Sequence, residues 1–145
     1  KTYDVPISWA GDSIAGFAGV DIDAELVVVA FRGTINPWIQ LSDEFLHASL
    51  VPLSNNDCWP NGAPSVKVNE YFLNGITLLY KDLMPLLTNL TSVYPDFPVL
   101  IAGHSLGGSL ASLGAYMGMT CEISGSPPLR IDSHVQVYTM VRGPD

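Results

Sequence analysis

A serine stands between two glycines at residues 103–107, which read Gly-His-Ser-Leu-Gly. A short apolar run at 99–102 precedes this pattern, and apolar residues recur at helical spacing from Leu106 to Met117. A serine on a sharp turn between a strand and a helix exposes its hydroxyl for attack on an acyl carbon, and the N–H groups at the helix start stabilise negative charge. The glycines are needed because a side chain would clash where strand and helix cross closely. The pattern predicts Ser105 as the nucleophile of an acyl-transfer reaction. The alternative is a glycine-rich turn whose serine has no catalytic role.

A second pattern, Phe31-Arg32-Gly33-Thr34, stands at the end of another apolar run. An acyl-transfer site needs two donors aimed at the developing oxyanion, one directly after the nucleophile and one from the loop of another strand. The backbone N–H of Leu106 meets the first condition. Thr34 meets the second through its N–H and its hydroxyl, although a Gly-Thr pair after a strand is also an ordinary turn. We expect Thr34 and Leu106 to form an oxyanion hole.

The elements that must position these residues alternate between strands and helices. Apolar patterns predict strands at 14–20, 26–31, 99–102 and 134–140. The strand at 26–31 is apolar on both faces, which predicts a central strand covered by helices on both sides. Apolar residues three to four positions apart predict an amphipathic helix, kinked near a proline: Val68, Phe72, Ile76, Leu79, Leu83, Pro85 and Leu87. We therefore expect an α/β fold with a mostly parallel sheet flanked by helices.

No repeat, low-complexity tract or linker divides the 145 residues, so we expect one domain spanning 1–145. Residues 35–65 are irregular and rich in Asn, Pro and Ser, which is typical of a functional loop. This segment also carries several large apolar side chains: Trp38, Ile39, Leu41, Phe45, Leu46 and Leu50. They predict a lid over the serine or, equally, ordinary core packing.

Composition excludes several classes of protein and partner. Hydrophobic residues make up 48% of the chain and charged residues 14%, which excludes intrinsic disorder. Six Lys and Arg against fourteen Asp and Glu give a net charge of −8, so no basic patch for nucleic acid or an anionic membrane can form. Residues 97–121 lack charged side chains, but Pro98, His104 and several serines and glycines make them too polar for a transmembrane segment. An uncharged or zwitterionic substrate fits this composition best.

Cys58 and Cys121 can form one disulfide or remain buried thiols, and they follow no metal-ligand spacing. We expect no metal and no organic cofactor. The tripeptide Asn89-Leu90-Thr91 is a glycosylation sequon, which favours secretion slightly because such tripeptides also arise by chance. The chain begins at Lys1 without a leader-like segment, which indicates a processed or cropped product. The sequence carries no signal for an oligomeric state.

Together these motifs resemble the class 3 lipases, the fungal-type triacylglycerol lipase family. The resemblance rests on FRGT followed by Trp38, on GHSLGG followed by SLASLGA, on the Tyr-Pro-Asp-Phe-Pro run at 94–98, and on the strand at 137–139. It runs from about residue 14 to the C-terminus. It implies an α/β-hydrolase fold, with Ser105 as nucleophile, Thr34 and Leu106 as oxyanion hole, and a lid at 35–65. It also implies a secreted enzyme that hydrolyses lipid esters through an acyl-enzyme at a lipid–water interface.

The chain departs from the family pattern at three places. Residues 68–72 read Val-Asn-Glu-Tyr-Phe where the family tends to have Val-His-x-Gly-Phe, and residues 140–144 replace its Phe-Gly-Gln-Pro-Arg-like turn. The family's triad acid and histidine lie downstream of residue 145. We assign no catalytic role to Asp145 itself. The chain therefore resembles a truncated N-terminal portion of the fold.

The residues within the chain offer a poor replacement for that acid and histidine. After Ser105 only His134 remains, and the candidate acid Asp132 lies two residues before it, too close for triad geometry. We expect His104 to point away from the serine and pack, and His47 to be solvated. Two functions remain: a lipid-ester hydrolase, complete in a longer form, or a catalytically inactive lipase-like fragment that binds lipid or another protein.

Overall fold

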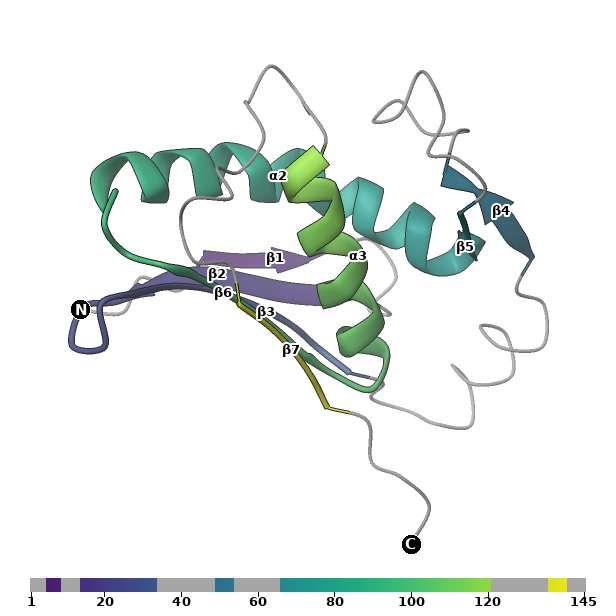
Figure 1. Ribbon diagram of the computed structural model, residues 1–145, viewed down its shortest axis with the longest axis horizontal. Coiled ribbons are helices and arrows are strands. Elements are labelled where there is room, and N and C mark those ends of the chain that lie inside the picture. Colours follow the sequence, from purple (N-terminus) through teal and green to yellow (C-terminus); the bar gives the residue numbers. More distant parts are fainter. Residues whose placement is uncertain (1–4, 9–13, 34–48, 54–65, 121–135, 141–145) are drawn as a thin grey trace, which may run out of the picture.

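The computed structural model describes residues 5–8, 14–33, 49–53, 66–120 and 136–140, with only the backbone described at 5–8 and 136–140. Five strands form one sheet in the order β1-β2-β3-β6-β7, and two more form a separate pair, β4-β5 (Figure 1). The strands are β1 (Val5–Ser8), β2 (Ala15–Asp21), β3 (Leu26–Phe31), β4 (Leu50–Pro52), β5 (Lys67–Asn69), β6 (Val99–His104) and β7 (Gln136–Met140). The described helices are α2 (Glu70–Val93) and α3 (Leu106–Thr120).

β2 and β3 form an antiparallel hairpin around a tight acidic turn. The Asp21 side chain accepts hydrogen bonds from the N–H groups of Asp23 and Ala24, at 3.1 and 3.0 Å. Glu25 closes the turn with a φ of 55°, in the left-handed region. Because so short a connection can only return the chain antiparallel, this end of the sheet is antiparallel. β1 extends it by pairing antiparallel with β2.

The other half of the sheet is parallel, as the alternation of strands and helices predicts. β3 pairs with β6 from Val27↔Val99 to Phe31↔Gly103, and β6 pairs in turn with β7. The expected strands at 14–20, 26–31 and 99–102 are confirmed within one or two residues, as is the strand near the C-terminal end of the chain. The sheet is thus mixed, and its parallel half carries the segment that contains Ser105.

α2 and α3 lie over the same face of the sheet (Figure 1). Val27, Val29 and Phe31 point toward them and are buried, whereas Leu26, Val28 and Ala30 are only half-buried. The expectation of helices on both sides of this strand is therefore not met within the described residues. The strand order explains this arrangement. β6 lies beside β3, and β7 lies beside β6 on its far side, so the sheet grows in one direction. Because parallel connections are right-handed, α2 before β6 and α3 before β7 then lie on the same face. Phe17 on the opposite face is 41% exposed.

α2 begins and ends with local hydrogen bonds. Asn69 is the N-cap, and its side chain accepts a bond from the Tyr71 N–H at 2.9 Å. At the other end the N–H of Tyr94 donates to the carbonyl of Leu90. Of the predicted apolar stripe, Ile76, Leu79, Leu83 and Leu87 are buried and Phe72 is half-buried. Three further side chains on this side of the helix are also buried: Leu73, Tyr80 and Met84. Val68, expected at the start of this helix, lies instead in β5, and the helix runs on through Pro85, which is exposed.

One buried polar contact joins the two helices. Tyr80 is 1% exposed, and its hydroxyl donates a hydrogen bond to the carbonyl of Gly114 in α3. Burial raises the pKa of Tyr80 far above its ordinary value of 10, so the phenol stays protonated at neutral pH. Gly114 also lets Phe31 and Ile76 approach α3 closely, since a Cβ there would lie 3.4 and 3.2 Å from their ring and methyl carbons. In the part of the chain described, no helix has the length and apolarity to cross a membrane.

Candidate active site

Ser105 occupies a strained turn between the parallel strand β6 and α3. Its φ is 54°, a left-handed conformation that costs a non-glycine residue free energy and persists only where the surrounding structure enforces it. Its side chain is exposed. Its carbonyl accepts hydrogen bonds from the N–H groups of Gly108 at 2.9 Å and Ser109 at 3.4 Å, which start the helix. The predicted strand–turn–helix setting of this serine is present.

The flanking glycines allow this turn to exist. A Cβ at Gly103 would collide with the carbonyl of Gly107, and a Cβ at Gly107 would collide with the carbonyl of Phe31. The same Gly107 Cβ would lie 2.9 Å from the carbonyl oxygen of Arg32. All of these atoms belong to the backbone, which cannot move aside cheaply. The prediction that the glycines serve the close crossing of strand and helix is confirmed.

The turn is also packed against the segment that carries the second motif. A Cβ at Gly33 would lie 2.8 Å from the carbonyl oxygen of His104, so the ends of β3 and β6 are adjacent there. Leu106 is the first residue of α3, and N–H groups in the first turn of a helix have no partner within it. Thr34 itself lies outside the described residues. The backbone thus places Leu106 beside the serine and brings Gly33, the neighbour of Thr34, next to residue 104.

The described residues hold no acid–histidine pair for Ser105. His104 is the one histidine among them; it is exposed, and its ring lies close to Gly33. The acidic turn at 21–25 and Asp96 lie at the amino ends of β3 and β6, whereas Ser105 follows the carboxyl end of β6. No cluster of His, Cys, Asp or Glu that could hold a metal occurs in the described part of the chain.

Several predicted features fall outside the described residues. They are His47, Asp132, His134, Asp145, both cysteines (Cys58 and Cys121), and most of the expected lid. Of residues 35–65, the described part is 49–53, where β4 pairs antiparallel with β5 and Leu53 is buried. This short pair leads directly into α2.

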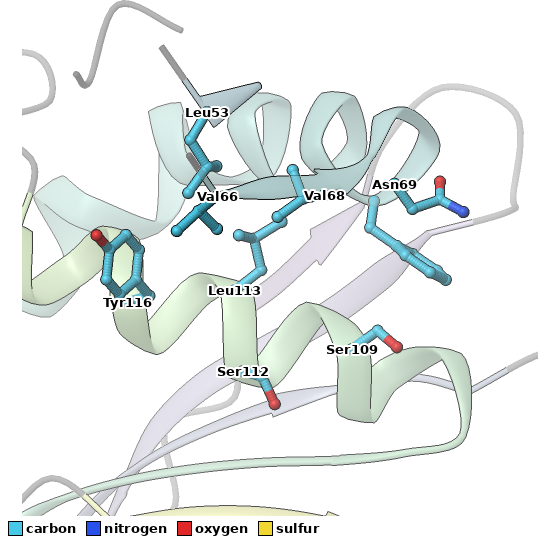
Figure 2. Close-up of a pocket in the computed structure, with 9 residues that line it drawn as sticks. Leu53, Val66, Val68, Asn69, Ser109, Ser112, Leu113 and Tyr116 are labelled. Carbon is cyan, nitrogen blue, oxygen red and sulfur yellow. The ribbon is translucent and has the colours of Figure 1, made fainter. Parts of the chain in front are cut away.

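An apolar cavity of about 360 Å³ lies beside α3, the helix that follows Ser105. Figure 2 shows Leu53, Val66 and Val68 on one side of it, with Leu113 and Tyr116 on α3. Ser109, one helical turn after Ser105 and hence about 6 Å further along the axis, also lines it. The hydroxyl of Ser112 is turned back onto its own helix, donating to the Gly108 carbonyl at 3.1 Å.

Sequence reasoning did not find this cavity. Its lining comes from the end of β4, from residues 66–72 in β5 and the start of α2, and from α3. Apolar residues such as Leu53 and Val66 were the available signal, but their meeting with α3 is a property of the tertiary fold.

A left-handed serine between a parallel strand and a helix, over a sheet covered by the two crossover helices, defines an α/β-hydrolase fold. The family model described as Lipase (class 3) matches residues 28–142. The chain therefore belongs to the class 3 lipase family, and the resemblance inferred from its motifs is confirmed.

Relatives and solved structures agree with this assignment. The chain is 30% identical over 116 residues to Lipase ZK262.3 of Caenorhabditis elegans, an alignment covering 79% of this chain and 30% of that protein. It is 33% identical over 100 residues to the secreted mono- and diacylglycerol lipase 2 of Gibberella zeae, covering 61% of this chain and 24% of that protein. The lipase structure from Rhizopus microsporus var. chinensis superposes with a TM-score of 0.72 at 24% identity, over 96% of this chain and 43% of that one. The chain thus spans less than half the length of these proteins.

The structure gives a physical role to Asn69, one of the residues at which the sequence departs from the expected family pattern. Asn69 caps α2. Asparagine is among the best N-cap residues because its side-chain oxygen reaches the N–H groups of the first turn. Asn69 therefore gives α2 a well-formed start.

Proposed function

We propose that this protein hydrolyses carboxylic esters of lipids through an acyl-enzyme at Ser105. The observation that carries the proposal is the exposed, left-handed Ser105 at the junction of β6 and α3. In the reaction, Ser105 Oγ attacks the ester carbonyl carbon and transfers its proton to a general base, and the alcohol leaves as the C–O bond breaks. Water then hydrolyses the acyl-serine bond. The Leu106 N–H and Thr34 would stabilise the oxyanion of both tetrahedral intermediates.

The apolar cavity supports an acyl chain as the part of the substrate that is recognised. It runs beside α3 from the first turn after Ser105 to Tyr116, about 10 Å along the helix axis at the usual rise per residue. Its walls are almost entirely hydrocarbon and carry no charged side chain. An acyl chain bound there would have its carbonyl end directed toward the serine and would gain about 0.8 kcal/mol for each buried methylene.

The relatives support an acylglycerol substrate and a place outside the cell. One of them is named a secreted mono- and diacylglycerol lipase. For this chain we propose a secreted lipase, acting at a lipid–water interface and covered in water by a lid within residues 35–65. The net charge of −8 supports an uncharged lipid ester over nucleic acid or an anionic surface.

A second candidate is a catalytically inactive, lipase-like binding module. What favours it is that the described residues hold no acid–histidine pair for Ser105. Without a general base the serine hydroxyl remains a weak nucleophile. Such a protein would retain the apolar cavity and bind lipid without turnover.

Labelling with a serine-directed fluorophosphonate separates the two candidates. A form that includes the downstream region present in the relatives should be labelled rapidly at Ser105, and the 145-residue chain only slowly. Ser105→Ala should abolish labelling, whereas Ser92→Ala, which removes an exposed hydroxyl from α2 away from the cavity, should leave it intact. Slow labelling of the longer form would favour the binding module. Rapid Ser105-dependent labelling of the short chain would show that it contains its own base.

A further inference from the structure

Asn89 lies on the solvent-facing side of α2, in the single Asn-x-Ser/Thr tripeptide of the sequence, Asn89-Leu90-Thr91. Its side chain is exposed, while Leu87 and Leu83 on the opposite side are buried against the core. The middle residue is not proline, so the tripeptide satisfies the acceptor rule. From these observations we infer that Asn89 is an N-glycosylation site. The inference is independent of ester hydrolysis but rests on the proposed passage through the secretory pathway.

The surface around Asn89 is suited to a bound sugar. Pro85 and Val93 lie four positions before and after Asn89, on the same line of the helix, and both are exposed; the exposed fraction of Val93 is 59%. From residue 83 to residue 94 the chain has no charged side chain. A glycan on Asn89 would cover the apolar surface on both sides of it and make this uncharged stretch of helix more soluble.

The position of Asn89 keeps a glycan clear of the proposed active site. α2 ends near the amino end of β6, and Ser105 follows the carboxyl end of the same strand (Figure 1). Six residues of extended strand separate the two ends by about 20 Å. A sugar at Asn89 therefore projects from the end of the sheet remote from the nucleophile.

The structure also indicates when the sugar is attached. In the folded helix the hydroxyl of Thr91 donates to the Leu87 carbonyl at 2.8 Å, so it is turned along its own helix. A transferase that reads this hydroxyl together with the Asn89 amide needs the segment in an open conformation. Asn89 lies within the last five residues of α2, and Pro85, four residues before Asn89, supplies no N–H to the helix. Attachment thus precedes the closure of this final part of the helix.

The covalent step is a transfer from an oligosaccharide carried on a polyprenyl pyrophosphate. The amide nitrogen of Asn89 attacks C1 of the first sugar, and the C1–N bond forms as the C1–O bond to the pyrophosphate breaks. The electron pair of the C1–O bond leaves with the lipid pyrophosphate, and the proton lost by the amide passes to a base of the transferase. No oxidation or reduction takes place.

Mass spectrometry of the protein, expressed from its natural coding sequence in a eukaryotic host, tests the inference. Treatment with peptide-N-glycosidase should convert Asn89 to Asp and increase gel mobility. Asn89→Gln and Thr91→Ala should each abolish the shift, and Thr91→Ser should retain it. Asn74→Gln is the matched control, because Asn74 is exposed on the same helix but lies outside a sequon.

A second sample carries an added leader that directs the chain to the endoplasmic reticulum. It tests whether Asn89 can accept a glycan, independently of whether the natural protein enters the secretory pathway. Modification of both samples supports the inference. An unmodified Asn89 in the leader-directed sample shows that the site is no acceptor and overturns it. Modification of the leader-directed sample alone overturns it for the natural protein, and leaves the proposed ester hydrolysis untouched.

Discussion

Ser105 adopts a backbone conformation that side chains other than glycine avoid, and the residues around it show why it stays there. The carbonyls of Gly107 and Phe31 fill the space that side chains would need at Gly103 and Gly107. The serine is therefore held by backbone packing on both sides, and the strain of about 1–3 kcal/mol is balanced by the fold. This arrangement fixes the hydroxyl before any substrate arrives.

Gly107→Ala should destabilise the protein because its new methyl group would meet backbone atoms of Phe31 and Arg32. Overpacking of this kind costs about 1–3 kcal/mol. The free energy of unfolding, measured in urea, should fall by that amount. Ser112→Ala, an exposed change on the same helix, should stay within about 0.5 kcal/mol of the parent. Equal stability of Gly107→Ala and the parent protein would show that strand and helix can separate at no cost.

At the scale of elements, the two helices are joined by a buried tyrosine as well as by apolar contact. Tyr80 reaches from α2 to the Gly114 carbonyl, in the helix that follows Ser105. A hydroxyl buried this deeply must be hydrogen-bonded, and it resists ionisation. The contact therefore links the stability of the helix pair to pH.

Stability should decline above pH 10 because of this group. The unfolded chain releases the Tyr80 proton near pH 10, whereas burial raises the pKa of Tyr80 in the folded protein and keeps the proton bound. The unfolded state then binds fewer protons, so the free energy of unfolding falls by up to about 1.4 kcal/mol per pH unit. Tyr80→Phe should flatten this decline and, at pH 7, cost about 1 kcal/mol for the lost hydrogen bond. Parallel pH curves for the two proteins, measured between pH 7 and 11, would exclude the linkage.

The elements show what a sequence can and cannot predict. The hairpin strands, the stripe of α2 and the turn at Ser105 depend on residues close together in the chain, and each was predicted from local patterns. The placement of both helices on one face depends on strand order, which local periodicity does not contain. Val68 was assigned to the helix because its spacing fits, but the N-cap at Asn69 starts the helix after it. The cavity, built from three separate segments, left no periodic signal.

At the scale of the whole molecule, the cavity beside α3 should set the preference for acyl length. Leu113→Trp would fill part of it, and losing room for two methylenes costs about 1.6 kcal/mol. In a catalytically active form, kcat/KM for a long-chain ester relative to an acetyl ester should therefore fall about tenfold, with the acetyl ester unaffected. Leu113→Ala should shift the ratio the other way. An unchanged ratio in both variants would place the acyl chain elsewhere.

The register of the sheet has a consequence for synthesis of the chain. β2 and β3 are separated by a few residues and can pair as soon as both have left the ribosome. On the other edge of β3, Val27 pairs with Val99. That edge therefore stays unpaired until 72 more residues have been synthesised. At about 5–20 residues per second the wait is roughly 4–14 s. During this time β3 presents an unpaired edge on a wholly apolar strand, the kind of surface on which nascent chains aggregate. Among the strands that the structure describes, we therefore expect the hairpin of β2 and β3 to need protection by a chaperone while the chain is being made.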